Sequence, residues 1–435
     1  MNELEIKTKA KNQLIKLELD ALHIGDVKSA YVPFDTLGKI MVGKIPMSAL
    51  CGNVLVVSDV GLLVAIRYRL KGLELDTSNV TFLCHTEKLR VYAQSLGIKT
   101  WFAPYNELDA FFCEGRVRLD DGELYSLKEK DMKTFDVCVG NPPFQPDTKE
   151  TEGGSGSRNK IWHKFIEKAF ELISQDGHML FVTPCGWRSG NLRKKACHLK
   201  AQTLIWKNSI KWNISTRNPV DYFPSIGYSC AIDAWHIKVG EQYDGIPEIL
   251  QKLQILPDDR STITIFAKFF QRCMTEKDII PFDGFMGQRN YVGILYKKSV
   301  GDNEHPYKVA NTSSQVRKGF FNWTSYEPPN FQSRKVIVSD TGDLGPWYDD
   351  GKCGTGDHSA AYKVASNEEG KRLIDFLNSP ARNAVLANNN ALGIPVHLIA
   401  KLPKQILELE WDEKNWKESA KQVFGFTDEE IEIIS

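Results

Sequence analysis

Residues 135–144, FDVCVGNPPF, give the clearest indication of the fold of this chain. The first part, Phe135–Val139, is a short apolar run with β-branched side chains, which is typical of a buried strand. Asn141-Pro142-Pro143-Phe144 follows at once, so we expect this tetrapeptide at the carboxyl end of that strand. Ligands of α/β proteins bind outside the carboxyl ends of the strands, which makes the tetrapeptide a candidate binding site.

Similar segments lie on both sides of this stretch. Asn53–Val57 (NVLVV) and Val80–Leu83 (VTFL) are further apolar runs that are followed by loops or helical patterns. Downstream, Ile161–Ile173 has apolar residues at helical spacing, and His178–Thr183 is another strand-like run after a turn. Alternating strands and helices predict an α/β fold, with a largely parallel sheet and helices on both faces.

The 435 residues are enough for two domains. The alternation fades from about residue 240, so we expect one domain over residues 1–240 and a second over 241–435. Between the strand and the helix described above, residues 145–160 (QPDTKETEGGSGSRNK) are too polar and glycine-rich to order themselves, and they predict a mobile loop.

Composition excludes several classes of protein. The 55 Lys and Arg residues balance the 55 Asp and Glu residues, so whole-molecule charge predicts no polyanionic partner. The 9 cysteines are scattered without C-x-x-C spacing, which disfavours a zinc ribbon or a disulfide framework and fits a reducing cytoplasm. No apolar stretch is long enough to predict a membrane span, and no residues at metal-ligand spacing predict a metal site.

The Asn-Pro-Pro-Phe tetrapeptide carries groups that are suited to binding an amine. Two prolines fix the backbone and remove two donors, which leaves rigid carbonyl groups that only accept hydrogen bonds. The Asn141 side-chain oxygen and the Pro142 carbonyl could together accept both protons of an exocyclic amine and make its nitrogen nucleophilic. Phe144 then offers a face on which a base can stack. The alternative is a rigid turn followed by a core phenylalanine.

Placed after a strand, DVCVGNPPF resembles the catalytic motif of amino-group methyltransferases that use S-adenosylmethionine, above all the gamma-class N6-adenine DNA methyltransferases. The resemblance extends over roughly residues 28–240, in the motif order of that class. It includes YVPFDTL from residue 31, NVLVVSDVG from residue 53, DGHMLFVTPCGW from residue 176 and DYFPSIGYSCAIDAW from residue 221. The glycine loop departs from the family pattern, since Ser58 to Gly61 keeps one acid and one glycine.

The resemblance implies a Rossmann-like methyltransferase sheet, the cofactor S-adenosylmethionine and a set of site residues. The catalytic residues would be Asn141, Pro142 and Phe144, and the cofactor would contact Tyr31, Pro33, Phe34, Asp59, Gly61, Glu87 and Asp109. Phe223 would be a second stacking face. Alternatives from the residues themselves are that Gly61 is a simple turn glycine, that Glu87 is a solvated acid near Arg90, and that Phe223 is a core residue.

A basic segment suggests nucleic acid. Residues 185–217 contain Lys or Arg at 188, 193, 194, 195, 200, 207, 211 and 217, with no Asp or Glu, among three tryptophans. We expect Arg188, Arg193, Lys194 and Lys195 to contact a phosphate backbone, and the indoles to support a displaced strand or to pack. The alternative is a solvated basic face.

The carboxyl-terminal part is expected to be an α+β target-recognition domain. Arg317, Lys318, Arg334 and Lys335 flank FFNWTSY, and the glycine-rich WYDDGKCGTGDHS from residue 347 could form an exposed loop that reaches a groove. This signal does not reveal a recognised sequence.

Together these features predict a cytoplasmic, S-adenosylmethionine-dependent DNA methyltransferase that flips an adenine out of double-stranded DNA and methylates N6. A restriction partner, if present, is expected to be a separate chain. Two alternatives stay open. One is methylation of a guanine amine in ribosomal RNA or of a glutamine amide in a protein. The other is an inactive, methyltransferase-like DNA-binding protein, because of the reduced glycine loop.

Overall fold

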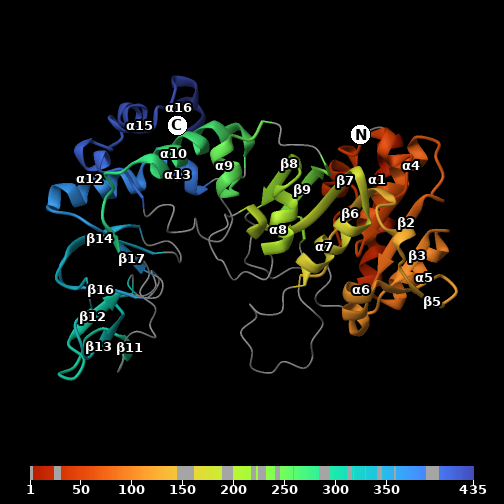
Figure 1. Ribbon diagram of the computed structural model, residues 1–435, viewed down its shortest axis with the longest axis horizontal. Helices are drawn as coiled ribbons and strands as arrows, with labels where there is room; N and C mark the ends of the chain where they lie inside the picture. The colour runs from red at the N-terminus through yellow and green to blue at the C-terminus, as the bar shows by residue number, and fades with distance from the viewer. Residues whose placement is uncertain are drawn as a thin grey trace. The chain divides into compact units, whose positions relative to one another are not determined.

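The computed structural model describes residues 3–23, 31–144, 161–188, 199–216, 222–223, 232–240, 245–257, 259–283, 294–310, 316, 318–328, 330–339, 345–356, 359–387 and 401–435. The chain divides into two compact units, Met1–Gly245 and Ile246–Ser435 (Figure 1). The predicted loop over residues 145–160 lies outside the described residues.

A nine-stranded sheet forms the centre of the first unit, in the order β5-β4-β3-β2-β1-β6-β7-β9-β8. The strands are β1 (Val54–Val57), β2 (Val80–Cys84), β3 (Lys99–Phe102), β4 (Arg116–Arg118), β5 (Leu124–Ser126), β6 (Phe135–Gly140), β7 (Ile173–Pro184), β8 (Ser209–Thr216) and β9 (Ile232–Lys238). The neighbouring strands β3, β2, β1, β6 and β7 are parallel to one another. In contrast, β4 is antiparallel to both β3 and β5, and β9 is antiparallel to both β7 and β8.

The central strands are buried on both faces, which explains why they are continuous apolar runs. Val54 of β1 pairs with Val80 of β2 on one side and with Val137 of β6 on the other. Every residue of β1 and β2 is buried, as parallel strands covered by helices require. Burying each such aliphatic side chain contributes about 1.5 to 3 kcal/mol, so this layer is the main source of stability of the sheet.

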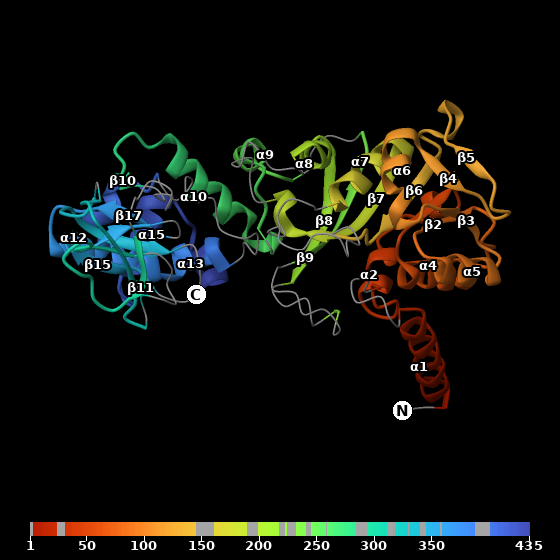
Figure 2. The ribbon, with the colours of Figure 1, turned by 90° about the horizontal axis from the view of Figure 1, so that it is seen from below.

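Helices cover both faces of this sheet. Figure 2 shows α2 (Leu37–Gly43), α4 (Val60–Gly72) and α5 (Glu87–Ser95) on one face, and α6 (Leu108–Glu114), α7 (Trp162–Leu172) and α8 (Leu199–Trp206) on the other. The chain starts with α1 (Glu3–His23) and passes through the short α3 (Met47–Leu50) before β1. The α/β architecture with helices on both faces is the predicted one.

Two helices of the first unit begin at the capping residues that chemistry favours. The Asp59 side chain accepts a hydrogen bond from the Leu62 N–H at the start of α4, and the Thr86 side chain accepts one from the Leu89 N–H at the start of α5. Both caps follow directly on the carboxyl ends of strands β1 and β2, so strand, cap and helix are encoded within a few residues.

The second unit contains two four-stranded sheets and a group of helices. One sheet has the order β10 (Phe282–Asp283), β17 (Ser359–Lys363), β14 (Arg334–Ser339), β15 (Trp347–Asp350), and the other β11 (Ile294–Lys298), β13 (Phe321–Thr324), β12 (Tyr307–Ala310), β16 (Gly354–Thr355). The pairing is antiparallel except between β12 and β16. The helices are α9 (Glu248–Leu253), α10 (Ile263–Thr275), α12 (Asn367–Asn378), α13 (Pro380–Ala387), α15 (Trp416–Phe424) and α16 (Asp428–Ile434).

Aromatic side chains join the helices of the second unit. Phe269 of α10 stacks on Phe424 of α15 with ring centroids 4.8 Å apart, and Phe376 of α12 meets Trp411 edge-on at 4.7 Å. Strands and helices are segregated in this unit, so the predicted α+β class of the carboxyl-terminal part is confirmed. Among the described helices of both units, none combines the length and the apolar character that crossing a membrane needs.

Candidate functional site

The predicted site residues of the first unit follow adjacent parallel strands. The carboxyl ends of β3, β2, β1 and β6 lie side by side at one edge of the sheet, because these strands are parallel neighbours. From β1 the chain continues to β2 and β3 on one side, and later to β6 and β7 on the other, so the strand order reverses between β1 and β6. Ligands of open α/β sheets bind at such a switch point.

Asp59 and Asn141 meet across this switch point. Asp59 follows β1 and is only 1% exposed. Its Oδ2 accepts hydrogen bonds from the Val32 N–H at 2.8 Å and from Asn141 Nδ2 at 3.1 Å, and its Oδ1 accepts one from the Leu62 N–H at 2.7 Å. One carboxylate thus connects the amino-terminal segment, the first turn of α4 and the predicted catalytic asparagine.

The Asn-Pro-Pro-Phe tetrapeptide is anchored at both ends. The Asn141 N–H donates to the Val57 carbonyl at 3.2 Å, and the Phe144 carbonyl accepts from the Ile161 N–H at 3.1 Å. Pro142 is buried, whereas Asn141 and Phe144 are partly exposed. The Phe144 ring packs against the apolar core on the α4 side of the sheet, and it keeps part of its surface accessible. The motif is therefore a rigid element at the ligand-binding edge.

His85 is a polar residue of this edge that the sequence analysis missed. It follows β2 directly, its Nε2 lies 2.5 Å from Ser58 Oγ, and its Nδ1 lies 2.6 Å from the Ala103 carbonyl. Burial lowers the pKa of His85 to about 4, so the ring is neutral at pH 7. The carbonyl can only accept, so Nδ1 carries the proton and Nε2 accepts from the Ser58 hydroxyl. Its position directly after a strand was the available signal.

Ser58, the other member of this pair, has an unusual backbone conformation. Its φ is +60, in the left-handed region that residues other than glycine rarely adopt. The residue stands where the family pattern has the beginning of the glycine loop, between β1 and the cap of α4. Backbone conformations of this kind are most frequent at functional sites, where the surrounding structure holds them.

Acid is expected to destabilise the first unit through its buried histidines. Burial, together with the charges of His178, Lys211 and Lys44, lowers the pKa of His236 to about 3, and burial lowers that of His85 to about 4. Above pH 6.5 both are neutral in the folded and unfolded chains, but below it only the unfolded chain binds their protons. The free energy of unfolding should therefore fall from pH 6.5 toward pH 4.

Thermal unfolding across this pH range measures that effect. The variant His236→Phe removes one of the two groups, so its melting temperature should depend less on pH than that of the wild type. An equal pH dependence in both proteins would contradict the assignment.

The amino-terminal segment lies against the start of α4. Tyr31 donates its hydroxyl proton to Asp20 Oδ1 at 2.7 Å, and burial and the neighbouring carboxylates raise the pKa of that phenol. The Pro33 carbonyl accepts from the Gly38 N–H at 2.9 Å, and the Phe34 ring stacks on Tyr68 of α4 with centroids 6.0 Å apart. The segment whose Tyr31, Pro33 and Phe34 are expected to contact the cofactor thus packs beside Asp59.

Gly61 is required by this packing. A Cβ at Gly61 would lie 1.9 Å from the Val32 carbonyl oxygen, so only glycine allows the segment to approach α4. Gly61→Ala is expected to displace the segment and to lower the free energy of unfolding by about 1 to 3 kcal/mol, as overpacking typically does. Gly72→Ala is the matched control in the same helix, because a Cβ there has nothing within 4 Å. Equal denaturation midpoints for the two variants would contradict this explanation.

The predicted acids Glu87 and Asp109 lie at the amino ends of the helices that follow β2 and β3. Glu87 is the first residue of α5 and pairs with Arg90 at 2.8 Å, with 57% of its side chain exposed. Asp109 lies in the first turn of α6 and pairs with Lys164 at 3.1 Å, with 90% exposed. The Arg90 contact agrees with the alternative interpretation of Glu87, and both carboxylates remain accessible at the ligand-binding edge.

Of the residues predicted to contact the substrate, the two that the structure describes, Phe223 and Arg188, are buried. Phe223 is 3% exposed and belongs to the apolar core, which agrees with the alternative that it is a core residue. Arg188 is completely buried, and its Nε lies 2.5 Å from Asp233 Oδ2. A guanidinium that is buried in an ion pair cannot reach a phosphate backbone, so the prediction for Arg188 is wrong. Arg193, Lys194 and Lys195 lie outside the described residues.

The tryptophans of the basic segment pack inside the unit. Trp187 and Trp206 are buried with ring centroids 6.3 Å apart, and the Trp206 indole N–H donates to the Trp187 carbonyl at 2.8 Å. Trp212 is half-buried on β8 and packs against the same apolar core as Phe144. Of the two roles considered for these indoles, packing is the one that the described geometry supports.

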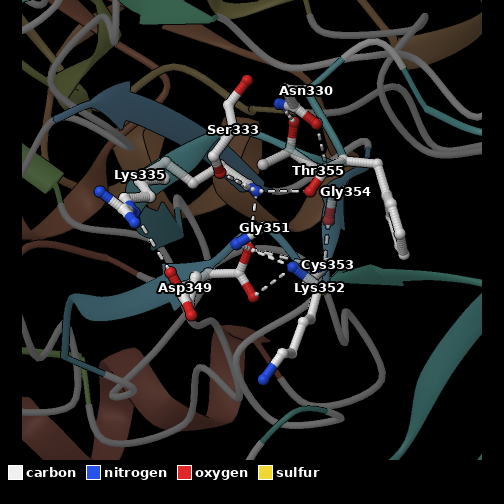
Figure 3. Close-up of polar contacts among 12 residues, drawn as sticks. Asn330, Ser333, Lys335, Asp349, Gly351, Lys352, Cys353, Gly354 and Thr355 are labelled. Carbon is white, nitrogen blue, oxygen red and sulfur yellow. Dashed lines mark hydrogen bonds and ion pairs between the residues drawn. The ribbon is translucent and has the colours of Figure 1, made fainter. Parts of the chain in front are cut away.

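In the second unit, the glycine-rich segment from residue 347 forms β15, the connection that follows it and β16, and its last residue begins β17, while residues 357–358 lie outside the described residues. Figure 3 shows the polar network at its centre. Lys335 is completely buried, and its Nζ donates to Asp349 Oδ2 at 2.6 Å and to the Ser333 carbonyl at 2.9 Å. Asp349 also accepts hydrogen bonds from the N–H groups of Gly351, Lys352 and Cys353.

This network changes two expectations about the second unit. Lys335 is a structural residue and cannot contact a groove, and the segment around Asp349 is a bonded turn between strands. Arg334, its neighbour on β14, is exposed and pairs with Asp350 at 3.3 Å, and Lys318 is exposed. Arg317 lies outside the described residues.

Residues 79–218 of the chain match the family of the Eco57I restriction-modification methylase. The matched segment runs from β2 through the Asn141 tetrapeptide to the end of β8. No curated protein matches the chain. The predicted resemblance is thereby confirmed at the level of a restriction-modification methylase family, over this part of the chain.

Several solved structures are similar to the chain at low sequence identity. The type IIL restriction-modification enzyme MmeI in complex with DNA is 10% identical, with a TM-score of 0.44 over 100% of this chain and 77% of that chain. The M protein of the type I restriction enzyme EcoKI is 11% identical, with a TM-score of 0.32 over 49% of this chain and 44% of that one. A putative class I S-adenosylmethionine-dependent methyltransferase from Listeria monocytogenes is 14% identical, with a TM-score of 0.34 over 55% of this chain and 71% of that chain. The nine-stranded mixed sheet has the α/β architecture that the sequence predicts.

Proposed function

We propose that this protein is a site-specific DNA methyltransferase that transfers a methyl group from S-adenosylmethionine to N6 of an adenine. The single observation that carries the proposal is the position of Asn141. It directly follows β6 at the topological switch point, inside the segment that matches restriction-modification methylases, and its side-chain amide is held by Asp59. Methylation of an exocyclic amine needs a pair of hydrogen-bond acceptors at this edge of the sheet, and Asn141 can provide one of them.

The chemistry of the sheet edge fits the cofactor. Glu87 and Asp109 are accessible carboxylates after β2 and β3, and carboxylates accept the hydrogen bonds that ribose hydroxyls and an adenine amine donate. We assign Glu87 to the ribose and Asp109 to the adenine of the cofactor. Tyr31, Pro33 and Phe34 would cover its methionine end. When bound, S-adenosylmethionine supplies an electrophilic methyl group on a sulfonium.

The residues of the tetrapeptide would hold the acceptor amine. Asn141 Oδ1 and the Pro142 carbonyl each accept one proton of the amine, which directs its lone pair away from the ring and toward the donor. Phe144 stacks on the base and fixes the plane of the ring. Direct transfer would form the bond between the amine nitrogen and the methyl carbon as the bond from that carbon to the sulfonium breaks. No covalent bond to the protein would form, and the surplus proton would leave the nitrogen toward solvent. Proximity and orientation provide most of the rate acceleration.

Access to the amine requires the base to leave the duplex. A stacked and paired adenine uses its amine for base pairing and cannot present the lone pair to a donor, so the nucleotide must be flipped into the site. The second unit, Ile246–Ser435, would serve as the target-recognition domain. The exposed cations Lys318 and Arg334 are candidates for backbone contacts. A restriction enzyme that cleaves the same site would be a separate chain.

Two other functions use the same geometry. A guanine amine in ribosomal RNA or a glutamine amide in a protein also presents an NH2 group to such an acceptor pair. The match to restriction-modification methylases favours DNA. The inactive alternative rests on the reduced glycine loop, in which a side chain at position 61 would clash with the Val32 carbonyl. Calorimetric titration with S-adenosylmethionine distinguishes it, because an inactive protein that has lost the cofactor site would release no binding heat.

The test of the proposed function is methyl transfer to three acceptors. The full chain is incubated with S-adenosylmethionine that carries a labelled methyl group, and with duplex DNA, ribosomal RNA or a protein extract. We expect label in DNA, as N6-methyladenine, and modification-sensitive sequencing of DNA from expressing cells then reads the recognised site. Label in RNA or protein instead, or none in any acceptor, would reject the proposal.

A further inference from the structure

We infer that Asp59 is a positioning residue, which sets the orientation of the Asn141 side chain rather than binding the cofactor. The inference rests on the proposed function and deepens it. It replaces the expectation, taken from the resemblance, that Asp59 contacts S-adenosylmethionine. What carries it is one hydrogen bond between residues 82 positions apart, Asn141 Nδ2 to Asp59 Oδ2 at 3.1 Å.

The chemistry of the two groups makes this hydrogen bond directional. An asparagine side chain can turn by 180° and exchange its oxygen and its nitrogen with little change in shape. A carboxylate only accepts hydrogen bonds, so the NH2 group of Asn141 must be the end that faces Asp59. The amide oxygen is thereby directed away from Asp59. The flipped amide would present an NH2 group to the amine of the substrate, and two donors cannot bond to each other.

The Asp59 carboxylate is itself held in place. Its other oxygen, Oδ1, accepts from the Leu62 N–H at 2.7 Å as the cap of α4, which prevents the group from rotating. The side chain is 1% exposed and turned toward donors of the protein. A charged hydrogen-bond acceptor in such an environment binds its donors more strongly than a neutral one.

Asp59 Oδ2, the oxygen that faces Asn141, also anchors the amino-terminal segment. Asp59 Oδ2 accepts from the Val32 N–H at 2.8 Å, next to Tyr31 and Pro33, which we assign to the cofactor. The cover of the cofactor site and the orientation of the acceptor amide therefore depend on one atom. Loss of the carboxylate should impair the catalytic step even where both substrates still bind.

A reciprocal exchange of the two residues tests the inference. In Asn141→Asp alone, two carboxylates lie about 3 Å apart, so they cannot both ionise easily and activity should recover as the pH falls. In Asp59→Asn alone, the new NH2 group competes with the donors that the carboxylate accepted. The double variant D59N/N141D restores the hydrogen bond with donor and acceptor exchanged, and residue 141 keeps an acceptor oxygen.

The expected result is a rescue of kcat. Each single variant should lose about 100-fold in kcat, the size of effect that misplacement of a reacting group by about 1 Å produces. The double variant should be at least ~10-fold faster than Asn141→Asp at pH 8, because the repulsion is gone. Its pH profile should match that of the wild type. Losses that simply add, with no rescue and no change of pH profile, would overturn the inference.

A second readout does not depend on methyl transfer. The side-chain NH2 signal of Asn141 in a nitrogen-15 NMR spectrum is identified by its disappearance in Asn141→Asp. Its protons should exchange slowly with solvent in the wild type and quickly in Asp59→Asn. If the wild type methylates no acceptor but this change occurs, the proposed function fails and the positioning role stands. If the wild type is active and Asp59→Asn changes neither kcat nor the amide signal, the inference fails.

Loss of a helix cap alone needs its own control. Ser366 caps α12 by accepting from the Glu369 N–H at 3.2 Å, as Asp59 caps α4. Ser366→Ala should show the modest loss of stability that a missing cap causes, while kcat stays unchanged. A similar loss of kcat in Ser366→Ala would mean that the effect of Asp59→Asn reflects stability, and this too would overturn the inference.

Discussion

The variant Asn141→Ala is expected to lose methyl transfer almost completely while it binds S-adenosylmethionine nearly as well as the wild type. Alanine removes one of the two acceptors that hold the amine, and Pro142 alone cannot fix its lone pair. Removing one preorganised hydrogen-bonding group from an active site typically costs about 10²- to 10³-fold in kcat, and we expect at least that. Single-turnover methylation of duplex DNA measures the rate, and calorimetric titration measures cofactor binding.

A second asparagine provides the matched control for this prediction. Asn53 precedes β1 at the opposite, amino-terminal edge of the central strands, where its side chain donates to the Thr134 carbonyl at 3.0 Å. Asn53→Ala removes the same chemical group from the same sheet and should leave kcat unchanged. Equal activity of Asn141→Ala and the wild type would reject the assignment of Asn141 as catalytic.

The variant Arg188→Met is expected to destabilise the protein severely. Arg188 and Asp233 lie 45 positions apart in the sequence, and both side chains are completely buried. Removal of the guanidinium therefore leaves a buried carboxylate without its ion-pair partner. Breaking such a pair typically costs about 3 to 5 kcal/mol, which is a large part of the stability of a domain. Denaturant unfolding of the full chain measures the change in the free energy of unfolding.

Two comparisons separate this explanation from a role in nucleic-acid binding. The double variant R188M/D233L removes both charges and should regain most of the lost stability. Arg116→Met breaks an exposed ion pair with Glu114 in the same unit, and it should cost less than about 1 kcal/mol. If Arg188→Met kept full stability but lost affinity for DNA, Arg188 would be a phosphate contact after all.

The sheet was predictable from the sequence because its signals are local. The runs NVLVV, VTFL and FDVCV are continuous and apolar, as central parallel strands are, and each became β1, β2 or β6 within about one residue. The place of Asn141 was predictable for the same reason: a residue that follows such a strand lies at the ligand-binding edge. Rigid prolines then limit what the following backbone can do.

The basic segment shows where this reasoning failed. A count of charges along residues 185–217 cannot show that Asp233, beyond the segment, buries and neutralises Arg188. Lys335 repeats the error in the second unit, since its partner Asp349 lies on the neighbouring strand β15. In both cases an ion pair with a carboxylate on another element turned a cation that looked available into part of the interior.

Local sequence therefore specified the strands, the edge of the sheet and the tetrapeptide, because apolar continuity and proline geometry act between neighbouring residues. The contacts that orient the site depend on residues distant in the chain: Asp59 reaches Asn141 across 82 positions, and His85 reaches Ser58 across 27. A hydrogen bond needs its two atoms within about 3 Å, and only the folded sheet brings the ends of β1, β2 and β6 that close.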